Sequence, residues 1–473
     1  MARPGLICTL GLIALHGSLA RADFPAAMAD FTAGRYEQAH AQFLTLAALG
    51  DAASQFNLGA MALQGQGGPK DLASAVGWLT AAAANGSRRL APEKLTELRA
   101  KLTDQERATA DGIANQYGQA GLQQTVLPIP PPGSHCRDLT PARLAHEAAV
   151  DAADYPRGGR FSDQNGFVIV QLTIGTDGTP RDPEVLMAVP GPEFAAASVD
   201  YWMRARWTPA TRGGTAVESK LSVKTVFHMY GGGVLWDLPS LKALRETALT
   251  GDPRAQYQIG LAATLDPTLG IPASQAFTLL VSAAQGGHAP AQYWAAKRFM
   301  SVGGCEVESK KLPWLRAAAT AGDGAAQLAL AESLLGGEPS VEQITEAKGL
   351  LEEAAQSDNY YVMKHVTALL ASPPLEAVRD APTAKAVAVR LVKDPIDTDP
   401  QKYEVAALAY AVNRDFWMAA AKEQAAIKVG TKLGWNTQPM QERLALYRKS
   451  QPWSGDVLAP PAAPGTTTAS AAH

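Results

Sequence analysis

The chain has 473 residues, of which 47% are hydrophobic and 18% are charged, so it can bury sizeable cores and divide into about three domains. Lys and Arg total 42 against 45 Asp and Glu, for a formal net charge of -3. This composition excludes a chain that is disordered throughout and argues against nucleic acid as a partner.

The first 22 residues have the pattern of a secretory signal. Arg3 precedes an apolar run, and Ala20-Arg21-Ala22 supplies the small residues of a cleavage site. We therefore expect cleavage after Ala22 and export across the inner membrane into the periplasm. The alternative is an uncleaved anchor from Leu6 to Leu19, although a bilayer span needs about 20 apolar residues.

A unit of similar length then recurs along the chain. Gly251, Gly287 and Gly322 open successive copies at intervals of 36 and 35 residues, and Gln follows each Gly five positions later. Apolar residues three and four apart on two segments of each copy predict a pair of helices that cannot bury its apolar face alone. Such units stack on their neighbours, so the sequence predicts a helical-repeat array.

The copy that begins at Gly50 shows the pattern most completely. Its signature residues are Gly50-Asp51, Ser54-Gln55, Leu58-Gly59, Gly65-x-Gly67, Asp71, Ala75 and Trp78. This pattern resembles the Sel-one-like repeats of the tetratricopeptide superfamily, which implies an α-solenoid. We expect Trp78 and Trp314 to fill the space between helix pairs, and Gly86, Gly287 and Gly322 to adopt a left-handed conformation where a helix ends.

Towards the C-terminus the repeat signature fades. Helices are expected at 360–370, 382–392, 403–412 and 416–429, with plainer tetratricopeptide character at the end. From Asp456 the chain is rich in Pro, Ala, Thr and Ser, and we expect this tail to be disordered.

A segment with a different period interrupts the repeats. The Pro-rich stretch at 127–133 predicts a stiff spacer. After it, alternating residues, an Asp-Gly turn and a helical stretch predict a small α+β domain with one covered sheet face. The expected elements are strands at 166–174, 184–189 and 217–229, a turn at Asp177-Gly178, and a helix at 194–205.

The residues of this segment also match a family pattern in order and spacing. They are Tyr155-Pro156, Gly166-Phe167-Val168, Asp177-Gly178, Trp202 to Trp207, Pro209-Ala210 and Gly213-Gly214. The segment resembles the C-terminal domain of the TonB energy-transducer family. In that family the domain lies in the periplasm and binds a short segment of an outer-membrane receptor as an added strand, which the resemblance implies for an edge here.

The final strand of this domain is the candidate binding edge. An edge strand offers unpaired backbone groups to a partner strand. The candidate peptide-binding residues are Ser219, Leu221, Val223, Thr225 and Phe227, with Tyr155 and Pro156 beside them. The alternative is that Tyr155, Pro156, Trp202 and Trp207 make the core of the domain.

Motifs for catalysis and metal binding are absent from the sequence. There is no His-x-x-x-His pair, no Gly-x-Ser-x-Gly elbow and no phosphate-binding loop. We expect no catalytic residue, metal or cofactor, and we interpret Glu352-Glu353, Asp397 and Asp399 as surface charges on or near helices, with no partner that would shift a proton affinity. After cleavage two cysteines remain, Cys136 and Cys305. They form either two free thiols or one disulfide, and the sequence favours neither.

The sequence therefore predicts a mainly α protein in which an α-solenoid of helix-turn-helix repeats flanks a small α+β domain of TonB C-terminal type. The expected divisions are a signal peptide (1–22), a first repeat array (23–120), a Pro-rich linker (121–140), the TonB-like domain (141–230), a Gly-rich joint (231–237), a second array (238–371), divergent tetratricopeptide-like helices (372–455) and a disordered tail (456–473).

The expected function is that of a periplasmic protein-protein interaction scaffold and not of an enzyme. Its partners would be proteins or peptides, including outer-membrane receptor segments, with membrane contact only if the signal stays uncleaved. The alternative is a membrane-anchored energy transducer that couples an inner-membrane motor to TonB-dependent transport at the outer membrane. An enzyme acting on cell-wall or antibiotic substrates is a third possibility, against which the lack of a nucleophile motif argues.

Overall fold

The computed structural model describes residues 23–127, 139–146, 166–227, 239–300, 308–373 and 375–458. The expected signal peptide, Cys136, Cys305, the Gly-rich joint and most of the Pro-rich linker and the tail lie outside these residues.

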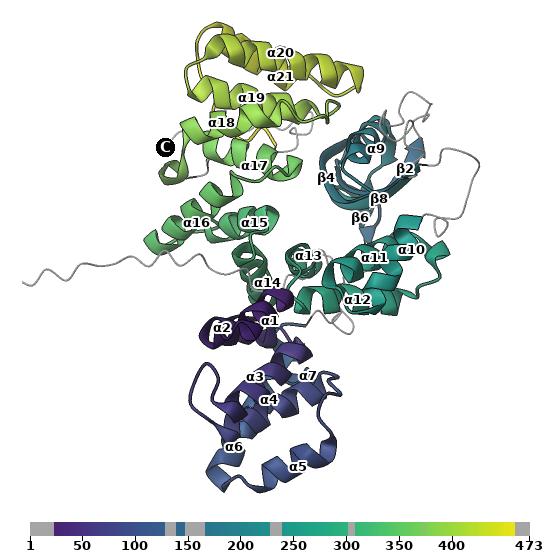
Figure 1. Cartoon of the computed structure of the whole chain (residues 1–473). Helices are drawn as coiled ribbons and strands as arrows, with labels where there is room; N and C mark the ends of the chain where they lie inside the picture. Colours follow the sequence, from purple (N-terminus) through teal and green to yellow (C-terminus); the bar gives the residue numbers. More distant parts are fainter. Residues whose placement is uncertain are drawn as a thin grey trace, which may run out of the picture.

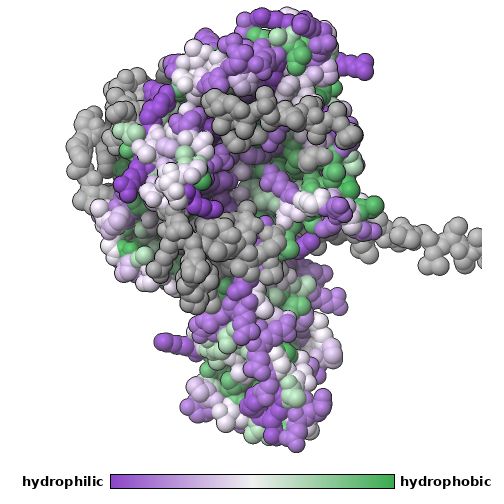
Figure 2. Space-filling view, turned by 180° about the vertical axis from the view of Figure 1, so that it is seen from behind, coloured by the Kyte–Doolittle hydropathy of each residue, from purple (hydrophilic) through white to green (hydrophobic). Residues whose placement is uncertain are grey.

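Seven helices form the N-terminal part of the molecule. Seen from behind, this part is a narrower column with a largely hydrophilic surface, below a broader body (Figure 2). The helices are α1 (Phe24–Thr32), α2 (Tyr36–Ala48), α3 (Ala52–Gln64), α4 (Leu72–Ala84), α5 (Pro92–Ala100), α6 (Asp104–Tyr117) and α7 (Gln119–Thr125).

The C-terminal helices pack as consecutive pairs and together form an arc (Figure 1). This arrangement confirms the predicted helix-turn-helix repeats. The helices are α10 (Pro239–Leu249), α11 (Pro253–Leu265), α12 (Ala273–Gln285), α13 (Ala289–Met300), α14 (Glu308–Thr320), α15 (Gly324–Leu334), α16 (Val341–Ala354), α17 (Tyr360–Ala371), α18 (Ala381–Leu391), α19 (Pro400–Val412), α20 (Phe416–Lys432) and α21 (Gln438–Arg448), with short 3-10 turns η3 (Pro267–Leu269) and η4 (Glu376–Val378).

The signature residues of the repeat satisfy the backbone where one helix ends and the next begins. Asp323 caps α15 by accepting a hydrogen bond from the Ala326 amide at 2.8 Å. Gln327, which is buried, donates to the carbonyl of Ala319 near the end of the preceding helix. Gly322, between the two helices, has φ +84°, so the left-handed conformation predicted from the sequence is confirmed.

The Leu-Gly pair of the signature has a packing role. A Cβ on Gly260 of α11 would lie 2.7 Å from Leu280 Cγ and 3.1 Å from the Ala276 carbonyl on α12. Gly59 has the same relationship to Leu79 and Ala75. Glycine at this position therefore lets the two helices of a repeat approach closely.

The N-terminal helices join the C-terminal arc directly. Trp314 of α14 is fully buried and donates through Nε1 to the Val126 carbonyl at 2.8 Å, and Gln285 Nε2 donates to the Leu49 carbonyl at 3.3 Å. The chain stays helical through Thr125, beyond the expected start of the linker at 121. The end of α7 contacts α14, where Lys310 donates to the Gln123 carbonyl and Trp314 to that of Val126, and Leu122 and Val126 are buried.

The α+β domain is built on a three-stranded antiparallel sheet in the order β4-β3-β8. Its main elements are β3 (Gly166–Ile174), β4 (Pro180–Val189), helix α9 (Glu193–Arg204) and β8 (Ser219–Phe227). Short strands that the sequence did not predict complete it: β1 (Leu139–Thr140), β2 (Arg143–His146), β5 (Arg206–Thr208), β6 (Ala210–Arg212) and β7 (Thr215–Val217).

Helix α9 covers one face of this sheet, as predicted. A Cβ on Gly166 would lie 2.4 Å from the ring of Phe194 on α9, so Gly166 and the alternate residues of β3 that follow it face the helix. The predicted Asp-Gly turn is also present, with Gly178 at φ +76°.

The end of the chain differs from the prediction in two places. Helix α21 was not predicted, and it packs on α20. The expected disorder from Asp456 is wrong for the first residues of the tail, because Val457 is buried and the Leu458 carbonyl accepts a hydrogen bond from Gln401.

Candidate functional site

The predicted binding strand, β8, lies at one edge of the sheet. It pairs with β3 along its whole length, from Ser219 opposite Ile174 to Phe227 opposite Gly166. Within the described ranges β3 is its neighbour in the sheet. The backbone groups on one side of β8 are therefore satisfied by β3, and those on its other side form the sheet edge.

The side chains of the candidate residues lie on the sheet face that α9 covers. Thr225 Oγ1 accepts a hydrogen bond from Trp202 Nε1 at 2.9 Å and lies 2.7 Å from Ser198 Oγ. The rings of Phe227 and Phe194 have centroids 5.3 Å apart, and Val223 is buried. These side chains belong to the domain core, so a partner at this edge would bind through the backbone of β8.

The remaining candidate residues are placed in part. Tyr155 and Pro156 lie outside the described residues, so their predicted position beside β8 stays a prediction. Trp202 and Trp207 are both buried and lie 5.8 Å apart by ring centroid. The core interpretation of this aromatic pair is therefore confirmed.

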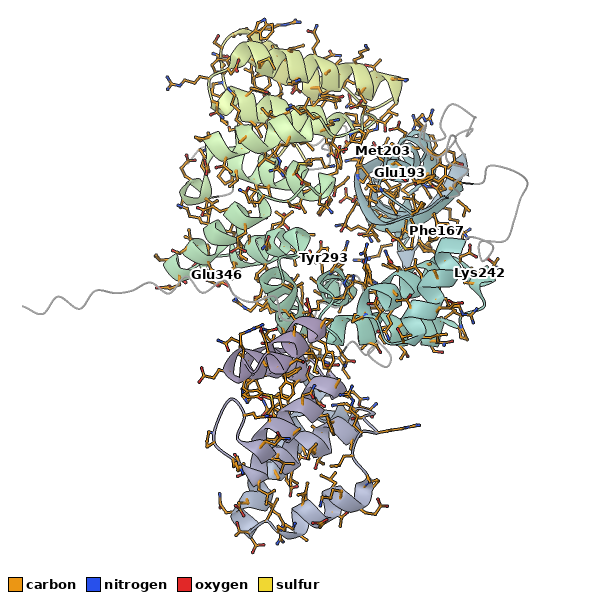
Figure 3. All side chains as sticks on the ribbon, in the orientation of Figure 1. Phe167, Glu193, Met203, Lys242, Tyr293 and Glu346 are labelled. Atoms are coloured by element: carbon orange, nitrogen blue, oxygen red, sulfur yellow. The ribbon has the colours of Figure 1, made fainter. Side chains whose placement is uncertain are left out.

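The opposite face of the sheet is covered as well, which corrects the expectation of a single covered face. This face lies against the concave side of the C-terminal arc, and Figure 3 shows Phe167 on the side turned toward α10–α13. Lys224 of β8 pairs with Asp266, at the end of α11, at 2.6 Å. Lys297 of α13 lies 2.6 Å from both Gln171 of β3 and Glu184 of β4. Side chains on the face that was expected to be exposed therefore bind the array.

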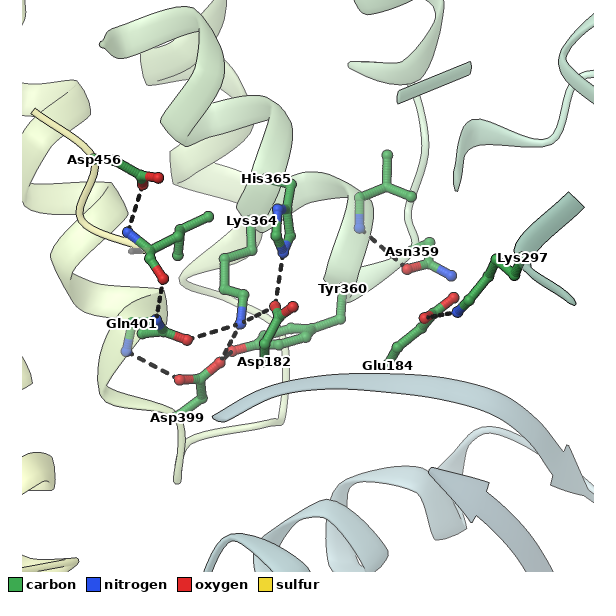
Figure 4. Close-up of polar contacts among 12 residues, drawn as sticks. Asp182, Glu184, Lys297, Asn359, Tyr360, Lys364, His365, Asp399, Gln401 and Asp456 are labelled. Carbon is green, nitrogen blue, oxygen red and sulfur yellow. Dashed lines mark hydrogen bonds and ion pairs between the residues drawn. The ribbon is translucent and has the colours of Figure 1, made fainter. Parts of the chain in front are cut away.

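The second edge strand, β4, is joined to α17 by charged groups (Figure 4). Asp182 Oδ1 lies 3.0 Å from Lys364 Nζ and 2.7 Å from His365 Nε2. Lys364 also lies 2.8 Å from Asp399, which accepts a hydrogen bond from the Tyr360 hydroxyl. Asp182 sits at φ +51°, where the pairing of β4 with β3 is irregular, and this turns its carboxylate toward α17.

The interpretation of Asp399 as a surface charge is wrong. Asp399 is completely buried, because it caps α19 and pairs with Lys364. Glu353 and Asp397 also have partners, Gln327 and Lys402. Spacing along the chain gave no sign of these contacts, since the partners come from other helices or turns.

The electrostatics of the site follow from burial and pairing. Burial by itself would raise the pKa of Asp182, but Lys364 and His365 outweigh it and hold the pKa well below its usual range. The pKa of Lys364 is raised, because Asp399 and Asp182 more than offset its burial. Burial lowers the pKa of Lys297, although Glu184 opposes this shift. Asp182 is therefore an anion at neutral pH.

Further contacts reach the far end of the arc. The Arg206 guanidinium donates to the Leu433 carbonyl, and the Thr398 hydroxyl donates to Asp200 on α9. We use the name clasp for the ionic contacts that join sheet and array, which are Lys224–Asp266, Lys297–Glu184, Lys364–Asp182 and His365–Asp182. The clasp connects the sheet to three helix pairs of the array, α11/α12, α13/α14 and α17/α18.

The sequence analysis did not single out the residues of the clasp. One local signal was available for Lys364, because it lies within a mostly apolar helix, YYVMKHVTALLA. A charge in such a segment is buried only when it is paired. For Lys297 and Glu184 the local sequence resembles that of any solvent-exposed charge.

The described ranges offer no group suited to metal binding or to a membrane span. These residues contain no cluster of three or more His, Cys, Asp or Glu that could hold a metal ion. None of the described helices combines the length and the apolar composition that a membrane span requires. One open cavity of about 520 Å³ lies beside α6 and α7, and no acidic or basic side chain lines it. Another, of about 450 Å³, lies between α15 and α17, and Glu332 is the one charged side chain in its lining.

The architecture defines a class: a helical-repeat protein whose arc encloses a small α+β domain. Comparisons with known proteins agree with the sequence-based resemblance for that domain, since residues 151–229 match the family model of the Gram-negative bacterial TonB protein C-terminal. The chain thus carries a domain of a family of the Gram-negative cell envelope. Helical repeats and domains of this type both serve protein-protein interaction.

Among solved structures, the chain is similar to a protective antigen present in uropathogenic Escherichia coli strains, which displays an SLR fold. The two share 15% identity, the match covers 90% of this chain and 82% of that one, and the TM-score is 0.34. No curated protein matches the chain.

Proposed function

We propose that the protein is a periplasmic interaction scaffold that binds an extended segment of a partner protein by strand addition to β8. The observation that carries the proposal is the position of β8 at the edge of a sheet of TonB type. A partner strand would complete the backbone hydrogen bonds on that side, and these bonds would supply affinity without a dedicated side-chain pocket.

The other edge is a poorer choice for a partner. β8 has one ionic pair with the array, Lys224 with Asp266. At β4 both Asp182 and Glu184 are paired, with α17 and α13, and β4 packs more extensively against α17 than β8 does against α11. A strand added there would have to separate these charges from their partners and leave them buried, which costs several kcal/mol. Strand addition is therefore expected at β8.

Hydrogen exchange tests this assignment. The full-length protein is titrated with a synthetic peptide from the short receptor segment that TonB-type domains bind, and exchange is followed by mass spectrometry. We expect slower exchange in β8 and unchanged exchange in β4. A peptide of the same composition with a central proline serves as the matched control, because proline cannot donate to the ladder. Unchanged exchange of β8 at saturating peptide would refute strand addition.

The location in the periplasm rests on the secretory pattern of residues 1–22 and on the family of the α+β domain. N-terminal sequencing and membrane fractionation in a Gram-negative host test it. A soluble protein that begins at Asp23 supports the scaffold. An intact N-terminus in the inner-membrane fraction would instead favour the alternative, an anchored energy transducer coupled to outer-membrane transport.

A catalytic role is not part of this proposal. The sequence lacks a nucleophile motif, and the TonB-type domain acts in binding. Assay of the purified protein for hydrolysis of cell-wall and antibiotic substrates tests this point, and turnover that persists through purification would overturn it.

A further inference from the structure

The concave side of a helical-repeat array is the surface that such arrays ordinarily offer to partners. In this chain the sheet domain lies inside the arc (Figure 1), and contacts run from Asp266 after α11 to Leu433 after α20. The chain therefore occupies its own concave surface, and another protein has access to that surface only if the sheet leaves it.

The contacts between sheet and array are charged to an unusual degree. The clasp joins three lysines and His365 to three carboxylates, and Lys364 is fully buried. Buried ion pairs contribute little net stability, because desolvation offsets most of the attraction, but they fix one orientation. Burial indeed lowers the pKa of Lys297 despite its pair with Glu184. Such a contact therefore determines the orientation of the sheet on the array more than it contributes to the stability of the interface.

An apolar patch on the sheet opposes its release. Gly166 faces α9, so Phe167 and Ile169 face the array by alternation along β3, and both are fully buried. Leaving the array would expose these apolar side chains to water, which is unfavourable. The closed arrangement is therefore the resting one, and opening requires a partner that covers what the sheet leaves.

We propose that the clasp is an autoinhibitory contact on the concave face of the array, and that the face accepts an acidic protein segment once the sheet leaves. Glu184 and Asp182 are two residues apart on β4 and reach Lys297 and Lys364. The competing segment would carry two carboxylates at a similar spacing. This inference adds a second binding surface, the concave face of the array, to the β8 edge. It rests on one part of the proposed function, namely that the array binds proteins.

Charge reversal with rescue tests the contact in the full-length protein and without any partner. In Glu184→Lys the added cation faces Lys297, so the sheet should leave the array. Hydrogen exchange should rise by at least tenfold in α13 and β4, and binding of a hydrophobic dye should increase as Phe167 becomes exposed. The double variant E184K/K297E restores the pair with opposite sign and should restore protection. Glu346→Lys is the matched control, because Glu346 pairs with Arg316 on the array surface and should change neither readout.

Two outcomes would overturn the autoinhibitory contact. One is an E184K protein with wild-type exchange in α13 and β4. The other is a double variant that remains as unprotected as the single one, which would mean general unfolding instead of release. Glu184→Gln keeps the side-chain shape and removes the charge, so it should give a smaller rise of hydrogen exchange in α13 and β4. This variant still tests the contact if the E184K protein fails to fold.

A peptide of residues 180–189 serves as the acidic probe for the exposed face. It should slow exchange of α13 in the E184K protein and have no effect on the closed wild type. The same peptide with Asp182→Asn and Glu184→Gln should have no effect on either. Equal effects of both peptides would refute recognition of carboxylates. Since these measurements do not involve the outer edge of β8, their failure is distinguishable from failure of strand addition.

Discussion

The ammonium group of Lys364 lies 3.0 Å from Asp182 Oδ1, and this contact joins two parts of the chain that fold on different principles. Asp182 belongs to an antiparallel sheet and Lys364 to a helical repeat. Asp399 lies 2.8 Å from the same nitrogen, so one buried cation is shared by two carboxylates.

Replacing Lys364 should be strongly destabilising. Lys364→Met leaves Asp182 and Asp399 buried without their cation, and loss of one partner of a buried pair costs about 3–5 kcal/mol. Denaturant unfolding of the full-length protein measures the change. Lys385→Met is the matched control, because Lys385 is partly exposed and pairs with Asp415 at 3.2 Å, and its loss should cost less than about 1 kcal/mol. Equal effects of the two substitutions would contradict the assignment.

The contribution of Asp182 should depend on pH. Its pKa is depressed in the folded state, so its stabilising effect is present above the unfolded pKa of about 3.9 and is lost as the pH falls toward the folded value. Lys364 and His365 on α17 face its carboxylate, with Asp399 beyond Lys364. Asp182→Asn should therefore destabilise the protein at neutral pH and have a diminishing effect below about pH 4. A difference in unfolding free energy that stays constant with pH would argue against this charge pairing.

A second buried cluster should respond to pH in the opposite direction. Arg443 lies between Glu404 and Glu423, with Nε 3.0 Å from Glu423 Oε1. Burial raises the pKa of Glu423 to about 8 and that of Glu404 to about 7. Folding therefore favours the protonated acids, and stability should fall as the pH rises from about 4.5 to about 8.

Glu423→Gln imitates the protonated acid and removes this dependence for one site. We expect a higher melting temperature than wild type at about pH 9 and little difference at about pH 5. Thermal unfolding at the two pH values measures it. Glu346→Gln, which alters an exposed pair, should shift neither value appreciably. A melting temperature of the E423Q protein below wild type at high pH would show that the ionised form is the stabilising one.

Close packing at the repeat glycines should make them intolerant of a side chain. Gly260→Ala places a methyl group against Leu280 and the Ala276 carbonyl, and such overpacking costs about 1–3 kcal/mol. Gly349→Ala is the matched control, because Gly349 lies in α16 with open space around it and alanine there should gain about 0.5–1 kcal/mol. Thermal unfolding of both variants should give shifts of opposite sign. A stabilising Gly260→Ala would show that the helices have room to separate.

The junction between the N-terminal helices and the arc depends on Trp314. Trp314→Phe removes the donor to the Val126 carbonyl and leaves space in a fully buried site, at a cost of about 2 kcal/mol or more. Hydrogen exchange should also rise in α7. Trp417→Phe is the control, because Trp417 is 79% exposed and its replacement should be nearly neutral. Unchanged exchange in α7 would mean that the junction is held by other contacts.

Much of the fold could be predicted from the sequence because its signals are local. Asp323 and Gln327 contact the backbone within eight residues of themselves, and such contacts recur with the period of the repeat. The Asp177-Gly178 turn and the alternation of β3 likewise depend on neighbours in the chain. The predicted β8 residues are in the expected strand, although their side chains support α9.

The contacts of the polar residues could not be predicted in the same way. Lys297, Glu184 and Asp399 have the local sequence of exposed charges, and their burial depends on residues far away in the chain. The sequence alone determined that helix pairs would stack and that a small sheet would interrupt them. Only the tertiary structure decided that the arc would close around the sheet, because its curvature brings α11, α13 and α17 to one face and their charges are satisfied there by Lys224, Glu184 and Asp182.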